Sequence, residues 1–327
     1  MKAIVFHSYG SPDVLKIEEI DKPVPKENEV LIKIHASSVN DWDWGLLRGV
    51  PFVNRIMVGL FRPKKIKTLG CDVAGHIESI GKNVSHFKIG DEVFGDLCES
   101  GFGGFAEYVC APEKILTPKP ANMTFEQAAA LPQAGLLALQ GLLDGHTLAQ
   151  RNLHGKKVLI NGASGGAGSF AVQIAKSLGA EVTGVCRTTK TEFVNLLGAD
   201  HVIDYMQEDF TRNGKCYDII LDMEAHHSIF DYKNSLKPFG RYYMVGGASA
   251  RIFQILFLSP IISMLSNKKM GILMYRANKD IDSLTTLFET ARITPIIDKI
   301  FPLNQTADAI RYFGEGYKKG KVVITME

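Results

Sequence analysis

The residues best placed to do chemistry form a glycine-rich turn in the middle of the chain. Residues 158–168 read Val-Leu-Ile-Asn-Gly-Ala-Ser-Gly-Gly-Ala-Gly, an apolar strand followed by a turn and the start of a helix. Ala163, Gly165 and Gly168 fall on the three glycine positions of the fingerprint that binds a dinucleotide pyrophosphate. The N–H groups and positive dipole end of the helix would face the phosphates. The predicted phosphate-binding residues are therefore Ala163, Ser164, Gly165, Gly166, Ala167 and Gly168.

The end of the next predicted strand indicates which nicotinamide cofactor binds. Sites that prefer NAD carry Asp or Glu there, about 20 residues after the glycines, to bind the ribose 2′-hydroxyl. This chain instead has Arg187-Thr188-Thr189-Lys190 after the strand at 181–186. A guanidinium can pair with a 2′-phosphate, which a carboxylate would repel. We expect NADPH, bound by Arg187, Thr188 and Lys190; the alternative is that Arg187 and Lys190 form a solvated surface.

The residue pattern changes along the chain, which indicates two domains that would position these residues. The first 120 residues hold short β-branched or alternating runs separated by turns, which is typical of a β-rich, barrel-like domain. An Ala/Leu-rich helix is then expected over Met123–Leu143, with Thr124 as its N-cap. Beyond it, strands and helices alternate, which predicts a parallel sheet covered on both faces. Because β character returns after Ile296, we expect a catalytic domain of residues 1–122 and 295–327 and a nucleotide-binding domain of residues 123–294.

Composition excludes some partners and leaves one segment ambiguous. The formal net charge is only +2 and no Lys/Arg run stands out, so nucleic acid is not an expected partner. Five scattered cysteines and the absence of a signal-peptide pattern favour a cytoplasmic protein with reduced thiols. Ile252–Leu265 is almost wholly apolar but has 14 residues and contains Pro260, whereas a membrane span needs roughly 20. We expect a buried or interface helix pair there, with peripheral membrane contact as the alternative.

Several motifs together resemble the medium-chain dehydrogenase/reductase superfamily, and within it the zinc-free quinone oxidoreductase branch. Besides the glycine turn, the motifs lie in the order typical of that superfamily and span essentially the whole chain; they are Ser37-Ser38-Val39-Asn40, Gly70-Cys71-Asp72-Val73-Ala74-Gly75, residues 87–93, residues 197–205 and Gly320-Lys321-Val322-Val323. The resemblance implies an α/β fold, in which a Rossmann doubly wound parallel sheet accompanies a β-rich GroES-like barrel domain.

The resemblance also implies chemistry without a metal. Where zinc-dependent relatives place Cys, His and Cys, this chain has Asn40, Cys71 and Gln133, and amides are poor zinc ligands. A quinone or α,β-unsaturated carbonyl needs less electrophilic help, because hydride addition gives a delocalised anion that hydrogen-bond donors can stabilise. Asn40 is the expected donor. Asp43 is expected either to relay a proton or only to fix its loop.

Further residues take their expected roles from the same resemblance. Gly246 and Gly247 would approach the nicotinamide ribose, Asn278 the nicotinamide end, and Tyr205 the adenosine phosphate, while Lys321 would line the cofactor cleft. The enlarged segment Phe52–Lys67 is expected to shape an apolar mouth together with Ile252–Leu265, which favours a small apolar quinone or enone as substrate. A homodimer is also expected, formed through edge strands near residues 241–245 or 271–275.

Two other functions agree with the same residues. The protein could reduce aldehydes or ketones without metal, or it could bind NADPH without turnover, as a sensor or structural protein. The identity of the acceptor and the one- or two-electron course of quinone reduction stay open at this level.

Overall fold

The computed structural model describes residues 1–326, which fold into two compact units. The first unit contains Met1–Gln133, Arg276–Thr285 and the chain from Pro295 onward, and the second contains Ala134–Tyr275 and Thr286–Thr294. The division differs from the expected one at residues 123–133 and 276–285, which pack with the first unit. Each unit has its own apolar core.

The first unit is built mainly from β-strands. Its strands are β1 (Lys2–Val5), β2 (Lys16–Glu19), β3 (Glu29–Val39), β4 (Asp72–Ile80), β5 (Glu92–Asp96), β6 (Tyr108–Pro112), β7 (Thr117–Pro118), β14 (Ile297–Pro302) and β15 (Lys321–Thr325). They form a mixed sheet in the order β14-β15-β3-β4-β5-β7, with β6 also paired to β3, and a small β1-β2 ribbon. Short helices close the unit: α1 (Asp41–Arg48), α2 (Val53–Val58), α3 (Phe125–Ala130), α10 (Thr306–Gly314) and the turns η1 (Pro12–Val14), η2 (Glu113–Ile115) and η5 (Leu303–Gln305).

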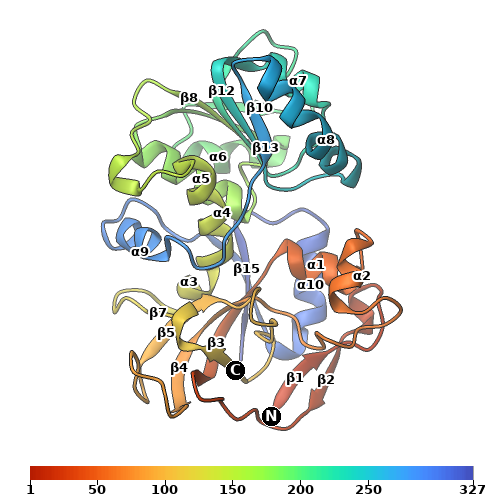
Figure 1. Cartoon of the computed structure of the whole chain (residues 1–327), viewed down its shortest axis with the longest axis vertical. Helices are drawn as coiled ribbons and strands as arrows, with labels where there is room; N and C mark the ends of the chain where they lie inside the picture. Colours follow the sequence, from red (N-terminus) through yellow and green to blue (C-terminus); the bar gives the residue numbers. More distant parts are fainter. Residues whose placement is uncertain (327) are drawn as a thin grey trace. The chain divides into compact units, whose positions relative to one another are not determined.

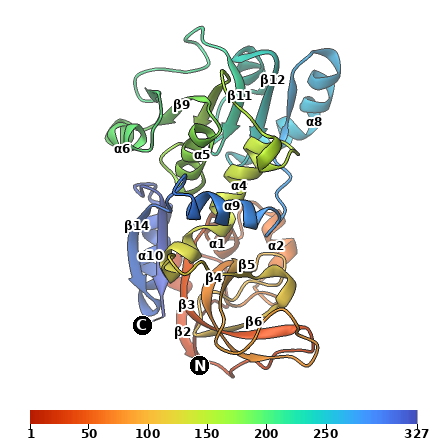
Figure 2. The same cartoon turned by 90° about the vertical axis from the view of Figure 1, so that its left-hand side faces the viewer.

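The chain's last strand returns to the first unit, as the sequence predicted. Strand β15 runs antiparallel to β3, and its register pairs Val322 with Val39. Figure 2 shows the preceding helix α10 beside β14, the neighbour of β15. The register brings Lys321 next to Asn40, although 281 positions separate them in the chain.

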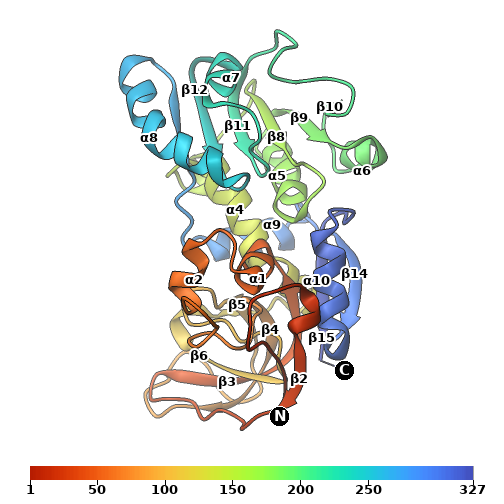
Figure 3. The same cartoon turned by 90° about the vertical axis from the view of Figure 1, so that its right-hand side faces the viewer.

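The second unit is a parallel sheet with helices on it (Figure 1). The six strands are β8 (Lys157–Asn161), β9 (Glu181–Cys186), β10 (His201–Asp204), β11 (Tyr217–Asp222), β12 (Leu236–Met244) and β13 (Lys269–Ile272). Their order is β10-β9-β8-β11-β12-β13 and all pairs are parallel, so the order reverses between β8 and β11 as in a doubly wound dinucleotide-binding fold. Figure 3 shows β12, β11, β8 and β9 side by side in that order. The helical segments, in chain order, are α4 (Pro132–Leu143), η3 (Leu148–Gln150), α5 (Gly166–Ser177), η4 (Thr188–Lys190), α6 (Thr191–Leu196), α7 (Ile229–Asn234), α8 (Ser249–Leu265) and α9 (Ile281–Glu289). The first two residues of α4 and the first five of α9 belong to the first unit.

Two helix predictions need correction. The helix expected over Met123–Leu143 is two helices, α3 and α4, that meet at Leu131. Pro132 explains the break, because proline donates no N–H and disfavours helical backbone in the residue before it. The N-cap at Thr124 is confirmed, since its hydroxyl accepts a hydrogen bond from Gln127 N.

The apolar segment at Ile252–Leu265 is a single helix, not the expected helix pair. Helix α8 continues through Pro260 and buries only Ile255, Ser259 and Ile262. No helix among residues 1–326 is long and apolar enough to cross a membrane. Strand β13 is an edge of the sheet whereas β12 is internal, so of the two strands expected to pair across a homodimer only β13 has an open edge.

Candidate functional site

The glycine turn joins β8 to α5 in the geometry that phosphate binding requires. Gly162 supplies the left-handed bend, with φ of 79°, and its N–H and that of Ala163 donate to Val185 O on β9. A Cβ atom added to Gly168 would lie 2.1 Å from the Gly162 carbonyl oxygen. Residue 168 must therefore be glycine for the helix to start so close to the strand.

Alanine at the first fingerprint position is accommodated by a glycine on the neighbouring strand. Ala163 is fully buried, and a Cβ atom on Gly184 of β9 would lie 3.1 Å from the Ala163 Cβ. The missing side chain at Gly184 leaves the space that the alanine methyl fills. Sequence reasoning gave Gly184 no role, because the contact depends on the register of β8 and β9.

The start of α5 fits a pyrophosphate. Gly165 is the N-cap and offers no side-chain cap, while first-turn N–H groups such as those of Gly166 and Ala167 have no acceptor within a helix. A Cβ atom on Gly165 would meet only Gly162 O, at 3.5 Å, so the space over the helix end is open. Ser164, also predicted here, is buried in the same turn. The residues present therefore suit a nicotinamide dinucleotide.

Arg187, Thr188 and Lys190, predicted at the 2′-phosphate, lie after β9, and Tyr205, predicted near the adenosine phosphate, lies after β10. Lys190 N donates to Arg187 O at 2.8 Å, and Tyr205 N donates to Cys186 O at 3.1 Å. Arg187 and Tyr205 are exposed, whereas Lys190 is buried. Lys190 is therefore not part of a solvated surface, the alternative that the sequence left open.

The same corner contains a carboxylate that the sequence reading did not expect. Parallel pairing places Asp204 of β10 opposite Cys186, and its Oδ2 accepts from Thr188 Oγ1 at 2.6 Å. Hydrogen bonds, first of all from Thr188, lower the pKa of Asp204, so this group is negative at neutral pH. The prediction that no carboxylate follows β9 holds along the chain but not in space.

Two polar residues missed by the sequence analysis lie where the strand order reverses. Asn161 ends β8 and Asp222 ends β11, and Asn161 Nδ2 donates to Asp222 Oδ1 at 2.7 Å. Burial raises the pKa of Asp222, and Tyr242 OH donates to its Oδ2 at 3.0 Å. The signal for this site was an acid directly after the apolar run Ile-Ile-Leu of β11.

The predicted pair, Gly246 and Gly247, lies close to Asp222 at the end of β11. Gly246 O accepts from Ala225 N at 3.0 Å. Gly247 has φ of 135°, and a Cβ atom on it would lie 2.4 Å from Ala225 N. The two glycines therefore follow β12 as expected, and close backbone packing against Ala225 accounts for at least Gly247. Their contact with a ribose stays a prediction.

In the first unit, Asn40 lies at the centre of a buried polar network. Its Nδ2 donates to Asp72 Oδ2 at 2.9 Å and to Ser38 O at 3.2 Å, and lies 3.2 Å from Cys71 Sγ. Its Oδ1 accepts from Lys321 Nζ at 2.5 Å. Both amide hydrogens are therefore already engaged, so Asn40 is less available as a donor than the sequence implied.

Asp72 and Lys321 complete this network. Asp72 Oδ1 accepts from Gln133 N at 3.0 Å, and its Oδ2 accepts from Ser38 Oγ at 2.8 Å and lies 3.4 Å from Lys321 Nζ. Asp72 is completely buried and Lys321 nearly so. Because a buried ammonium is costly without partners, the carboxylate and the Asn40 oxygen explain how Lys321 is held there. The side-chain Nε2 of Gln133 is buried and has no hydrogen-bond partner among residues 1–326.

Asp43 fixes the turn after β3. Its Oδ2 accepts from Asn40 N and its Oδ1 from Gly70 N, both at 2.8 Å. Burial raises the pKa of Asp43 to about 7, against the opposing effect of these two N–H groups. The structure therefore supports the loop-fixing role, and proton relay stays a prediction.

Asn278 has a structural role within the first unit. Its Oδ1 accepts from Asp96 N and its Nδ2 donates to Asp96 O, both at 2.8 Å. The positive φ of 57° at Asn278 is one that asparagine tolerates better than most residues. Both the oxygen and the nitrogen of its amide thus bond to Asp96 of β5, and its contact with nicotinamide stays a prediction.

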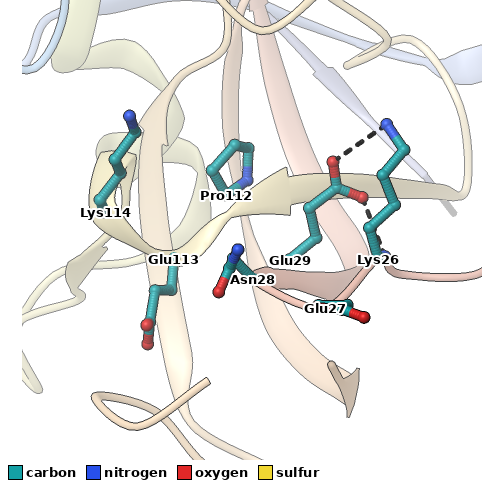
Figure 4. Close-up of a pocket in the computed structure, with 7 residues that line it drawn as sticks. All are labelled: Lys26, Glu27, Asn28, Glu29, Pro112, Glu113 and Lys114. Carbon is teal, nitrogen blue, oxygen red and sulfur yellow. Dashed lines mark hydrogen bonds and ion pairs between the residues drawn. The ribbon is translucent and has the colours of Figure 1, made fainter. Parts of the chain in front are cut away.

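A surface pocket of the first unit shares no residue with this network (Figure 4). It is formed by the start of β3 and the end of β6, where Lys26 pairs with Glu29 at 3.5 Å. The lining residues are Lys26, Glu27, Asn28, Glu29, Pro112, Glu113 and Lys114. None of the predicted site residues is among them.

Two family models and several known proteins match this chain. A family model described as an alcohol dehydrogenase GroES-like domain matches residues 26–121, and one described as a zinc-binding dehydrogenase matches residues 197–324. The chain is 31% identical to the chloroplast envelope quinone oxidoreductase homolog of Arabidopsis thaliana, over 99% of this chain and 98% of that protein. It is 32% identical to the chloroplastic NADPH-dependent alkenal/one oxidoreductase of the same plant, over 99% of this chain and 79% of that protein.

A solved structure shows the same likeness. The quinone oxidoreductase from Coxiella burnetii superposes with a TM-score of 0.87 at 29% identity, over 100% of this chain and 99% of that chain. The chain belongs to the medium-chain dehydrogenase/reductase superfamily. It is a quinone oxidoreductase-like member with the expected GroES-like and Rossmann-type units, and its cofactor is a nicotinamide dinucleotide.

The positions implied for the catalytic zinc ligands hold Asn40, Cys71 and Gln133 here, and a cluster of possible metal-binding groups lies around Cys71. Cys71 Sγ and carboxylate oxygens of Asp72 and Asp96 lie within 4.8 Å of one another, the one such cluster among residues 1–326. Burial and the nearby carboxylates raise the pKa of Cys71 well above its usual value, so its sulfur is a neutral thiol in this structure. The Asp72 oxygens are engaged by three N–H or O–H donors and lie beside Lys321. A cation is thus supplied by the chain itself, and metal-free chemistry stays a prediction.

Proposed function

We propose that this protein transfers a hydride from NADPH to a quinone or an α,β-unsaturated carbonyl compound without a metal ion. The observation that carries the proposal is the buried hydrogen bond from Lys321 to Asn40. Asn40 is at one of the positions that hold the metal in zinc-dependent members of the superfamily. The names of the relatives, quinone oxidoreductase and alkenal/one oxidoreductase, support the same class of acceptor.

NADPH is proposed over NADH because of the charges at the ends of β9 and β10. Arg187 and Lys190 supply two positive groups, and Asp204 supplies one negative group whose oxygens already accept from Thr188, Met206 N and Gln207. The exposed guanidinium of Arg187 forms no ion pair with a carboxylate of the described residues, so it is available to pair with a 2′-phosphate.

The chain's own groups account for the rest of the chemistry. NADPH supplies the hydride when bound, and the acceptor oxygen then becomes negative. Lys321 is the buried cation in the polar network, and a positive charge in a poorly solvated site stabilises such an oxygen strongly. Asn40 orients Lys321 through the 2.5 Å contact, and Asp43 fixes the backbone N–H of Asn40. We therefore assign charge stabilisation to Lys321 and positioning to Asn40.

The test is NADPH oxidation with a benzoquinone, an alkyl enone and an aldehyde, each repeated with NADH and with a chelator. We expect chelator-resistant turnover of the quinone or the enone. Turnover of the aldehyde alone would indicate a metal-free aldehyde reductase, and tight NADPH binding without turnover would indicate a sensor or structural protein. Loss of activity with chelator would contradict the metal-free mechanism.

Lys321→Met tests the assigned residue, with Lys319→Met, an exposed neighbour, as the matched control. We expect kcat/KM for the acceptor to fall about 100-fold or more, the usual effect of losing an oxyanion-stabilising group, while the Kd for NADPH changes little. If instead the Kd for NADPH rises and kcat is retained, Lys321 binds the cofactor, as the family resemblance alone implied.

A further inference from the structure

The segment 50–67, called the 50–67 loop below, exposes an unusual number of apolar side chains. Phe61 is 89% exposed, Phe52 62% and Ile56 61%. The other exposed apolar residues of the loop are Val50, Val53, Met57 and Leu60. Soluble proteins rarely leave so many large apolar side chains next to one another in water, and such patches mark interaction surfaces.

The same loop is strongly basic. It ends in Arg62, Lys64, Lys65 and Lys67, all exposed, and none of them forms an ion pair with another residue of the described chain. No Asp or Glu occurs between Asp43 and Asp72. Apolar and cationic side chains therefore lie together without the acidic residues that usually neutralise a protein surface.

Contacts with neighbouring segments hold the backbone of the loop, so its apolar side chains project from a folded segment. Helix α2 lies beside α1 (Figures 1 and 3), and Tyr9 OH donates to Gly59 O at 2.5 Å. Val58 is fully buried, and its carbonyl oxygen accepts from Lys64 N and Lys65 N, both at 3.1 Å. These contacts bury Val58 while its neighbours in the loop face outward.

We propose that the 50–67 loop docks the protein peripherally on an anionic lipid bilayer. Phe52, Ile56 and Phe61 enter the boundary between headgroups and acyl chains, and the four basic residues pair with headgroup phosphates. Binding of this kind combines buried apolar area with attraction to anionic lipid. It requires no membrane-spanning helix.

The charge of the loop argues against a second copy of this chain as the occupant. In a two-fold dimer the same patch faces itself, so two uncompensated clusters of Arg and Lys would meet and repel each other. Helix α8 also exposes apolar side chains, among them Phe257 and Leu265, but Arg251 is its single charged residue. Lys268 and Lys269 follow the helix, and Lys268 Nζ already donates to Lys233 O, so the cationic part of this helix is smaller than that of the 50–67 loop.

The test is flotation of the full-length protein with vesicles of phosphatidylcholine alone and of phosphatidylcholine with phosphatidylglycerol. We expect binding to the anionic vesicles that weakens at high salt. Lys64→Gln with Lys65→Gln should weaken binding about 25-fold, since each basic residue near an anionic surface contributes about a factor of five. Phe61→Ser should weaken it at least tenfold. The matched controls are Lys16→Gln with Lys114→Gln, and Leu196→Ser, which changes another highly exposed apolar residue.

Because the substituted residues are exposed, each variant should keep the wild-type thermal midpoint, and this midpoint is measured to show that the variant is folded. Each outcome then decides the proposal. Absence of binding to anionic vesicles by the wild-type protein would overturn the proposal. Equal binding to neutral vesicles, or equal loss in the control variants, would overturn the role of the loop. A concentration-dependent dimer that Phe61→Ser abolishes in sedimentation velocity, without vesicle binding, would show that the patch is a contact between copies.

Discussion

Replacing Arg187 with alanine tests how the second unit selects its cofactor. Arg187 follows β9 directly and is exposed, with Lys190 and Tyr205 nearby. If its guanidinium pairs with the 2′-phosphate, the variant loses a charge-assisted contact that NADH never makes. The affinity for NADPH should then fall while the affinity for NADH stays constant.

The expected size of the effect follows from exposure. A hydrogen bond to a charged group contributes about 1.5–3 kcal/mol, and solvent screening at an exposed site favours the lower end. About 1.5 kcal/mol corresponds to about a tenfold rise in the Kd for NADPH. Asp204→Asn should act in the opposite direction and strengthen NADPH binding, because it removes the negative charge beside Thr188.

The assay titrates the protein with NADPH and with NADH and follows intrinsic fluorescence or heat to obtain each Kd. It compares the wild type, both variants and Lys215→Ala, which serves as an exposed control. If Arg187→Ala weakens the binding of NADPH and NADH equally, Arg187 does not select the 2′-phosphate. If Asp204→Asn improves NADH binding, Asp204 repels a feature common to both cofactors and does not discriminate between them.

Three further predictions concern stability. Gly168→Ala places a Cβ atom 2.1 Å from Gly162 O, so it should lower the free energy of unfolding by about 2 kcal/mol or more and abolish cofactor binding; an unchanged denaturation midpoint in urea would contradict the turn geometry. The carboxyl of Asp43 has a pKa of 3.8 as its ordinary value and about 7 when folded, so the folded state holds an extra proton between these values and loses that stabilisation as pH rises through 7. Urea unfolding should therefore show a larger advantage of the wild type over Asp43→Asn at pH ~5 than at pH ~7.5, and the reverse order would show that the two N–H donors outweigh burial. Gln133→Leu should raise the thermal midpoint, because it removes a buried Nε2 without a partner at a gain of about 1 kcal/mol, whereas a lower midpoint would mean that water or a ligand satisfies that atom.

The amino-acid sequence was sufficient for features that depend on neighbouring residues. The glycine turn, the N-cap at Thr124 and the strand-helix alternation follow from local backbone preferences and apolar periodicity, which act over a few positions. The chain's return to the first unit could be predicted from the β character after Ile296 and from the family resemblance. The effect of Pro132 on the helix is also local, so the break between α3 and α4 can be predicted from that proline.

Only the tertiary structure decided which charges meet. Asp204 reaches the end of β9 through the register of a neighbouring strand, and Lys321 reaches Asn40 because β15 pairs with β3. These pairings join positions far apart in the chain, so no local pattern encodes the distance between their side chains. Burial follows the same principle: it raises the pKa of Asp43 and keeps the thiol of Cys71 protonated, because solvent is excluded by segments that the sequence places elsewhere.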